Sequence, residues 1–295
     1  MRSILNKKKI LILGINGTLG KKLYQDLKKN RNFRTCGISK KNSDFNLNLE
    51  NFKKLELFLK KNKFEIVVNC AAYTNLIFCE KNFKKILKVN TLLPAKLSLW
   101  TSRYNFKYVH ISTDHVYLSK KNVANKENSK IGWHNYYSKS KFLAEKKLMN
   151  KSNLIIVRTN FMDDKRNKKS FLNWLHKLIK NKIEIPLYKD MYTSTIDLRS
   201  LTKILIKLIL KNSSGVFNIG SSEYISKKQF ALKYFKKLKI NPLFKDVKTN
   251  DKLQSTIKRG RFLGLNIKKI EKILKIKMPN SDKVINNLYH ENFRN

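Results

Sequence analysis

Short apolar runs alternate with amphipathic stretches along the first half of the chain. Residues 10–13 form an apolar run of strand length, and leucines recur at helical spacing through residues 18–29. The alternation continues with an expected strand at 33–38, a helix at 51–61 and a strand at 65–70. Strands that alternate with helices in this way form βαβ units, in which parallel strands lie side by side. We therefore predict an α/β fold built on a doubly wound parallel sheet of the Rossmann kind.

The pattern changes after about residue 160. Amphipathic helices are expected over residues 170–180, 197–210 and 226–237, and a strand within residues 215–219. We predict that residues 1–160 form the Rossmann domain. Residues 161–295 are expected to form a smaller C-terminal α/β substrate lobe that is partly interleaved with the first domain.

Net charge is the most unusual feature of the composition. The chain has 65 Lys and Arg residues against 20 Asp and Glu residues, a formal charge of +45. Such a charge is typical of proteins that bind nucleic acid or an anionic membrane. The lysines nevertheless recur along the whole chain rather than in one basic arm. We therefore interpret most of them as a solvated surface layer and expect no nucleic-acid or membrane partner.

Cysteine usage and apolar run lengths favour a cytoplasmic location. The three cysteines, Cys36, Cys70 and Cys79, are too scattered for a disulfide framework or a CxxC metal site. The apolar run at 10–13 is too short for a signal peptide, and no segment reaches the ~18 apolar residues of a membrane span. We expect a soluble cytoplasmic protein without a metal site.

A glycine-rich segment, GINGTLG, follows the first expected strand and opens the first expected helix. Its glycines are Gly14, Gly17 and Gly20, three of only nine in the chain. In this position glycines let backbone N–H groups approach a pyrophosphate at the positive end of a helix. The segment therefore predicts a dinucleotide site and makes residues 1–160 an NAD(P)-binding domain.

The end of the second expected strand distinguishes between the two nicotinamide cofactors. An acidic residue there binds the ribose hydroxyls of NAD, whereas basic residues accommodate the 2′-phosphate of NADP. The chain has Lys40 and Lys41 at this point and no acid before Asp44. This favours NADP(H), although NAD(H) stays possible.

Tyr137 and Lys141 form a YxxxK pair on an expected helix. Residues four apart share one helix face, where an ammonium group can lower the pKa of a phenol and make it a proton donor. The chain contains four pairs with this spacing, so context must distinguish them. Tyr137 follows a strand that ends in Ser112 and Thr113, and open α/β sheets bind ligands at the carboxyl ends of their strands.

Together these segments resemble the extended short-chain dehydrogenase/reductase family, in particular its dTDP-4-dehydrorhamnose reductase branch. The resemblance spans nearly the whole chain and rests on GINGTLG, NCAAYTN, ISTDHVY, YYSKSKFLAE, VRTNF and SGVFNIG. It implies NADPH-dependent reduction of the 4-keto group of a nucleotide-activated deoxysugar, in dTDP-rhamnose or related cell-surface polysaccharide biosynthesis. The expected small-molecule partner is a nucleotide sugar, and a homodimer is one option for the quaternary state.

The resemblance also implies roles for individual residues. Tyr137 would protonate the developing alkoxide, Lys141 would lower its pKa and hold the nicotinamide ribose, Thr113 would bind the carbonyl oxygen, and Asn90 would support the lysine through a water. The expected cofactor-binding residues are Gly14, Asn16, Gly17, Thr18, Leu19, Gly20, Lys40, Asn46, Leu47, Cys70, Ala71, Ala72, Tyr73, Tyr137 and Lys141. The expected substrate-binding residues are Thr74, Thr113, Asp114, Phe161 and Arg259.

Several positions depart from the branch pattern. His115 stands where an aromatic residue is usual, Ser138 replaces the glycine after the tyrosine, Thr195 replaces a common proline, and Gly260 replaces the proline of an Arg-Pro pair. These departures bear on the identity of the sugar rather than on the reaction.

Three other functions stay open. One is an NAD-dependent nucleotide-sugar epimerase or dehydratase of the same superfamily, and another is a non-catalytic NAD(P)-binding regulatory subunit. A polyanion-binding protein that uses the +45 charge is the third.

Overall fold

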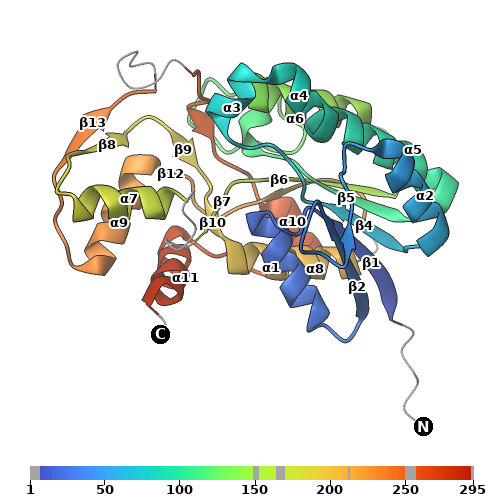
Figure 1. Ribbon diagram of the computed structural model, residues 1–295. Coiled ribbons are helices and arrows are strands. Elements are labelled where there is room, and N and C mark those ends of the chain that lie inside the picture. The colour runs from blue at the N-terminus through green and yellow to red at the C-terminus, as the bar shows by residue number, and fades with distance from the viewer. Residues whose placement is uncertain (1–6, 149–152, 164–169, 212, 250–256, 294–295) are drawn as a thin grey trace, which may run out of the picture.

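The structure, a computed structural model, describes residues 7–148, 153–163, 170–211, 213–249 and 257–293. At its centre lies a seven-stranded sheet with the order β11-β6-β5-β4-β1-β2-β3 (Figure 1). Every pairing in this sheet is parallel. Its strands are β1 (Lys8–Leu13), β2 (Phe33–Ser39), β3 (Phe45–Asn46), β4 (Ile66–Asn69), β5 (Lys107–Ile111), β6 (Leu154–Thr159) and β11 (Gly215–Ile219).

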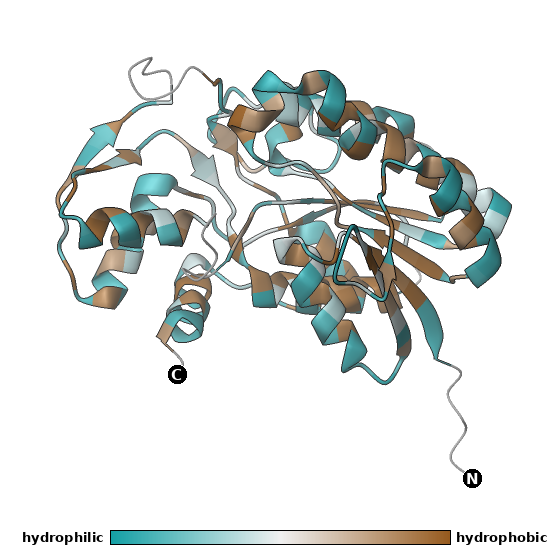
Figure 2. Ribbon diagram, in the orientation of Figure 1, coloured by the Kyte–Doolittle hydropathy of each residue, from teal (hydrophilic) through white to brown (hydrophobic). Residues whose placement is uncertain are grey.

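Helices cover both faces of the sheet because its strands are apolar on both sides. In β1, Ile10 and Ile12 belong to one core cluster and Leu11 and Leu13 to the other. Figure 2 shows the corresponding brown strands between helices whose outer surfaces are largely teal. One face packs against α1 (Thr18–Lys28), α8 (Leu198–Leu210) and α10 (Lys268–Leu274), and the other against α2 (Phe52–Asn62), α5 (Leu93–Tyr104) and α6 (Tyr136–Leu148). The predicted doubly wound α/β fold is confirmed.

Strand order reverses between β1 and β4. β2 and β3 extend the sheet on one side of this point, and β5, β6 and β11 extend it on the other. Open α/β sheets bind ligands outside the carboxyl ends of the strands at such a reversal. The glycine-rich segment follows β1 directly, so the topology places it at this crevice.

Residues beyond 160 contribute to both parts of the molecule. β11 completes the central sheet, and α8 packs on α1. The others form a smaller lobe beside the carboxyl ends of the central strands (Figure 1). The helices of this lobe are α7 (Phe171–Lys180), α9 (Lys227–Leu238) and α11 (Ser281–Phe293). Two of its short sheets have two strands each, β7 (Phe161–Met162) with β10 (Ile196–Asp197) and β8 (Ile185–Tyr188) with β13 (Phe244–Val247). In the third sheet β9 (Tyr192–Thr193) lies between β12 (Ile225–Ser226) and β14 (Phe262–Leu263). The boundary at residue 160 itself stays a prediction.

The segment between β4 and β5 is helical over much of its length. It contains α3 (Leu76–Lys81) and α4 (Phe83–Leu87), and a π-helical turn over Lys88–Leu92 joins α4 to α5. A π-turn inserts an extra residue into a helix and often occurs at functional sites. Here it carries Asn90, which is fully buried.

A buried ion pair ties α6 to the sheet behind the crevice. Arg158 Nη2 lies 2.7 Å from Glu145 Oε2, and both side chains are at most 1% exposed. Arg158 also donates to the Tyr117 hydroxyl (2.9 Å), which donates to Asn218 of β11 (2.7 Å). Glu145 in turn accepts a hydrogen bond from Ser112. Buried charges need such partners, and this network links α6, β6, β11 and the end of β5.

Candidate active site

A cavity of about 450 Å³ opens at the carboxyl ends of β1, β4 and β5. Its walls come from the central sheet, from α6 and from the smaller lobe. Twelve of the residues predicted from the sequence line it: Gly17, Thr18, Leu19, Cys70, Ala72, Thr74, Thr113, Asp114, Tyr137, Lys141, Phe161 and Arg259. The other predicted residues, Gly14, Asn16, Gly20, Lys40, Asn46, Leu47, Ala71, Tyr73 and Asn90, lie outside this lining.

Two glycines of the glycine-rich loop pack too closely on their neighbours to be replaced by a residue with a side chain. Gly14 has φ +84°, and a Cβ atom there would lie 2.8 Å from Ala71 Cα. A Cβ atom on Gly20 would collide with the Gly14 carbonyl oxygen. The loop therefore presents bare backbone at the N-terminus of α1, the form of cradle that accepts a dinucleotide pyrophosphate. The residues present fit such a cofactor.

The turn after β2 lies against this loop. Asn16 donates from its backbone N–H to Ser39 Oγ (3.1 Å) and from Nδ2 to the Lys41 carbonyl (2.7 Å). Asp44, the first acid after β2, accepts from the Tyr24 hydroxyl (2.7 Å) and from the Gly37 N–H (2.8 Å). Because these donors already engage its carboxylate, Asp44 is poorly placed to bind ribose hydroxyls. Lys40 and Lys41 follow β2 directly, and both side chains are exposed; Lys40 Nζ lies 3.9 Å from Glu50 Oε1.

Replacing Lys40 and Lys41 together with alanine should weaken NADPH binding about tenfold while changing the Kd for NADH less than about twofold. Only NADPH has the 2′-phosphate that these cations would contact. Titration of both cofactors by fluorescence or calorimetry measures the difference. The matched control is the Lys60→Ala, Lys61→Ala variant, which removes the same charge from exposed positions on α2. An equal loss for the two cofactors would contradict the assignment of the 2′-phosphate to this turn.

The side chains of Thr113 and Tyr137 share a hydrogen bond in the wall of the cavity. Thr113 follows β5, and Tyr137 lies in the first turn of α6. Burial raises the pKa of the Tyr137 phenol well above its ordinary value, and a hydrogen bond with Thr113 opposes that rise. Tyr137 is therefore protonated at neutral pH and able to donate. The expected influence of Lys141 on this phenol stays a prediction.

The Lys141 ammonium group has two hydrogen-bond acceptors at β5. Its Nζ donates to the Ile111 carbonyl (2.6 Å) and lies 3.1 Å from His110 Nε2. Burial lowers the pKa of His110 well below its ordinary value, so the ring is neutral and its Nε2 can accept from the ammonium. The other ring nitrogen, Nδ1, lies 3.2 Å from the Tyr108 hydroxyl. Sequence reasoning did not identify His110, because only the fold brings it under the lysine.

Asn90 fixes the loop after β4 against α6. Its Oδ1 accepts from the Tyr73 N–H (2.8 Å), and its Nδ2 donates to the Tyr73 carbonyl (2.9 Å) and to Ser140 Oγ (3.0 Å). These bonds hold the loop that supplies Cys70, Ala72 and Thr74 to the cavity. The water-mediated support of Lys141 by Asn90 stays a prediction.

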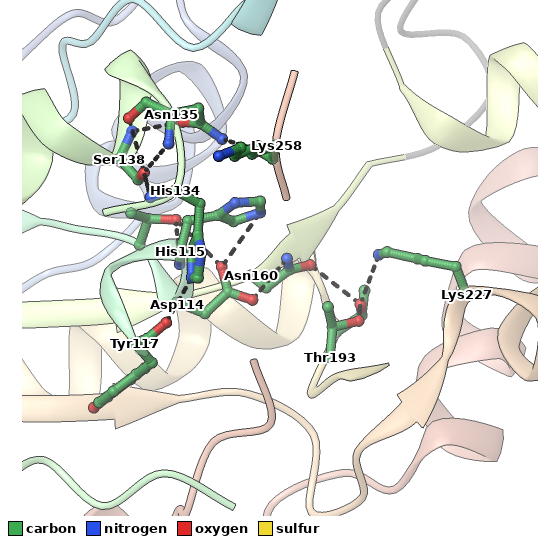
Figure 3. A network of polar contacts seen from close by, with 12 residues as sticks. Asp114, His115, Tyr117, His134, Asn135, Ser138, Asn160, Thr193, Lys227 and Lys258 are labelled. Carbon is green, nitrogen blue, oxygen red and sulfur yellow. Dashed lines mark hydrogen bonds and ion pairs between the residues drawn. The ribbon is translucent and has the colours of Figure 1, made fainter. Parts of the chain in front are cut away.

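The cavity also contains polar residues that the sequence did not single out. Asn160 follows β6 and donates to Asp114 Oδ2 (3.0 Å), and Lys227 reaches the cavity from the start of α9 (Figure 3). The position of Asn160 directly after a central strand was a usable signal. Lys227 had no such signal in the sequence, because it is one of many lysines and lies far along the chain from the recognised motifs.

The described residues contain neither a membrane-spanning helix nor a cluster of metal-binding side chains. Within the described ranges, no helix is long and apolar enough to cross a membrane. Across the same part of the chain, no three His, Cys, Asp or Glu side chains gather as a metal site requires.

Comparison with known proteins identifies the family. Residues 8–293 match the family model for the RmlD substrate binding domain, and the chain belongs to that family. It is 26% identical to the dTDP-4-dehydrorhamnose reductase of Aggregatibacter actinomycetemcomitans, over 95% of this chain and 98% of that protein. It is 27% identical to the spore coat polysaccharide biosynthesis protein SpsK of Bacillus subtilis, over 76% of this chain and 77% of that protein.

Solved structures agree with this fold. The crystal structure of dTDP-4-dehydrorhamnose reductase from Bacillus anthracis in complex with NADP superposes with a TM-score of 0.86 at 22% identity. The match covers 97% of this chain and 98% of that one, so both the central sheet and the smaller lobe have counterparts.

Proposed function

We propose that this protein is an NADPH-dependent reductase that acts on the 4-keto group of a nucleotide-activated deoxysugar. The observation that carries the proposal is that Thr113, Tyr137 and Lys141 line the same cavity as the glycine-rich loop. A proton donor, its supporting hydroxyl and a cation thus lie beside a dinucleotide cradle. A role in dTDP-rhamnose or related cell-surface polysaccharide synthesis is supported by the names of two relatives, a dTDP-4-dehydrorhamnose reductase and a spore coat polysaccharide biosynthesis protein.

In this proposal the backbone of Gly14–Gly20 and the loop of Cys70–Tyr73 hold NADPH. When bound, the cofactor supplies the hydride. Tyr137 donates its phenolic proton to the sugar oxygen at C4, and the Thr113 hydroxyl positions that oxygen. The Lys141 ammonium stabilises the phenolate that Tyr137 becomes. Thr113 and Lys141 are buried and Tyr137 is half-buried, so the protein excludes much of the water and strengthens these interactions.

The value of kcat/KM for reduction should fall as the pH rises through about 8. Burial lowers the pKa of Lys141 to about 8, so its positive charge is lost above that value. The Tyr137 pKa is raised, so the phenol keeps its proton over the same range. Initial rates of NADPH oxidation between about pH 6 and about pH 10 measure the profile. A rate constant that stays flat to about pH 9.5 would contradict this role for Lys141.

A cofactor-oxidation assay with a panel of nucleotide 4-keto sugars tests the proposed function. We expect stoichiometric NADPH oxidation with at least one dTDP-linked or related sugar, and a 4-hydroxy product by NMR. Sugar conversion without net cofactor oxidation would instead indicate an epimerase or dehydratase. Tight NADPH binding with no conversion of any sugar would indicate a regulatory subunit.

The proposal also includes a homodimer and a cytoplasmic location. Sedimentation velocity of the purified protein tests the homodimer.

A further inference from the structure

A buried row of four polar side chains ends at the cavity: Asn69, Tyr108, His110 and Lys141. His110 Nε2 lies 3.1 Å from Lys141 Nζ, and His110 Nδ1 lies 3.2 Å from the Tyr108 hydroxyl. Asn69 Nδ2 donates to the same hydroxyl (3.3 Å). All four residues are at most 2% exposed, and among the described residues the Tyr108 hydroxyl has no other partner. The hydrogens of the buried row must therefore be matched to acceptors within the protein.

The charged form of Lys141 allows one arrangement of these hydrogens. A neutral imidazole has one N–H donor and one acceptor nitrogen, whereas an ammonium group only donates. The His110 ring is neutral, because burial and the charge of Lys141 hold its pKa well below the ordinary value. Lys141 then donates to the Ile111 carbonyl and to His110 Nε2, and the ring hydrogen lies on Nδ1, facing the Tyr108 oxygen. In this arrangement the hydrogen of the Tyr108 hydroxyl has no acceptor in the buried row.

The uncharged form of Lys141 allows a second arrangement with the same heavy-atom positions. An amine nitrogen has a lone pair, so it can accept a hydrogen placed on His110 Nε2. Nδ1 then becomes an acceptor for the Tyr108 hydroxyl, which keeps its hydrogen because burial raises its pKa well above the ordinary value. Asn69 donates to the Tyr108 oxygen in both arrangements, since its Oδ1 already accepts from the Ala71 N–H (3.1 Å). The buried row therefore has a complete set of partners when the lysine is neutral.

The other ionisable groups that face Lys141 come from α6 and from the loop after β4. Glu145, one turn further along α6, and Cys70 both raise the pKa of Lys141, and burial outweighs them. The Cys70 thiol is neutral, because burial raises its pKa to about 12. The Glu145 carboxylate is an acceptor only and is shared with Arg158 of β6 (2.7 Å). The imidazole, in contrast, can reverse the direction of its hydrogen bond to the lysine.

We propose that His110 is a positioning residue that changes its ring tautomer when Lys141 changes charge, and so keeps the lysine hydrogen-bonded in both forms. The two arrangements differ by one proton, which Lys141 releases to water in the cavity that it lines. The ring hydrogen moves from Nδ1 to Nε2 by exchange with water during local opening. The inference rests on the proposed function only for its consequence, namely that the buried row fixes the pH above which the reductase loses the cation that supports Tyr137.

Long-range ¹H–¹⁵N NMR of protein labelled with ¹⁵N-histidine tests the proposal, because it distinguishes the two neutral tautomers from the imidazolium ion. The chain has five histidines, and the His110→Gln variant identifies the His110 signals. Between about pH 6.5 and about pH 9.5 we expect His110 to change from the Nδ1–H to the Nε2–H tautomer without populating the imidazolium ion. The midpoint should lie near the Lys141 pKa of about 8.

Lys141→Met is the matched control for the NMR titration, because it should leave His110 in one tautomer over the same pH range. His176, which lies 2.9 Å from the Tyr234 hydroxyl, is an internal reference whose signals should not respond to this substitution. A single His110 tautomer at every pH in the unmodified protein would overturn the inference, and so would a change of tautomer that persists in Lys141→Met. Neither result involves a sugar, so failure to reduce any keto sugar would overturn the proposed function alone.

The consequence for catalysis is tested with two substitutions of His110. In the unmodified protein the alkaline fall of kcat/KM should coincide with the midpoint of the tautomer change. His110→Gln, whose amide can turn to accept or to donate, should keep kcat/KM within about threefold, whereas His110→Leu should lower it about tenfold or more. Circular dichroism melting curves show whether each variant is folded. An unchanged kcat/KM in His110→Leu would overturn the positioning role.

Discussion

Replacing Tyr137 with phenylalanine should lower kcat for keto-sugar reduction by about 10²–10⁴-fold. The change removes the hydroxyl that donates the proton, and the phenyl ring still fills the same position on α6. The Kd for NADPH should therefore stay within about twofold of the unmodified value. Steady-state rates with saturating NADPH, together with a cofactor titration, separate these two effects.

Tyr136→Phe provides the matched control for this result. Tyr136 is the preceding residue, its ring stacks on Phe83 with centroids 4.4 Å apart, and it does not line the cavity. Its loss should leave turnover nearly unchanged. Turnover by Tyr137→Phe at the rate of the control would remove Tyr137 as the proton donor and leave the acid to be found among the other groups of the cavity.

The Glu145→Gln variant should lose about 3–5 kcal/mol of unfolding free energy. The change leaves the Arg158 guanidinium buried without its carboxylate, and Arg158 is 1% exposed. It also weakens the acceptor for Ser112, which lines the cavity. Urea denaturation followed by tryptophan fluorescence measures the loss, provided that the transition is two-state.

An exposed pair in the same chain calibrates this effect. Glu56 lies 2.6 Å from Arg103 Nη1, and the side chains are 30% and 66% exposed. Glu56→Gln should leave the free energy of unfolding nearly unchanged, because water screens this pair. Similar losses in the two variants would show that the buried network does not hold α6 on the sheet.

The parts of the fold that the sequence predicted are those with local signals. Apolar runs of strand length and leucines at helical spacing depend on neighbouring residues, and they predicted the strands at 10–13 and 65–70. The three-glycine segment was equally informative through its spacing. Contacts within a few residues explain Gly20, whereas Gly14 is required by the close approach of Ala71, in the loop after β4. The π-turn at Lys88–Leu92 had no such signal, and it packs against α6, an element distant in the sequence.

Residues whose contacts in the cavity are with residues distant in the sequence were not predicted. His110 touches Lys141 because β5 lies under α6, and Lys227 reaches Thr195 because the smaller lobe folds back over the strand ends. Neither position is unusual in the sequence. Two departures from the branch pattern do acquire a structural explanation. The Ser138 hydroxyl accepts hydrogen bonds from the His134 and Asn135 N–H groups before α6. The Thr195 hydroxyl donates to Asn160, which in turn donates to Asp114.

The position of β11 has a consequence for how this chain can be divided. β6 is an interior strand only because β11, more than fifty residues later, pairs along its edge from Ile155 to Thr159. A fragment that stopped at residue 160 would expose that apolar edge to pairing with other chains. It would also remove Asn218 from the buried network of Arg158. Residues 1–160 and the residues that follow them therefore cannot be exchanged between relatives as independent domains. A chimaera of this protein must keep β11 together with the other strands of the central sheet.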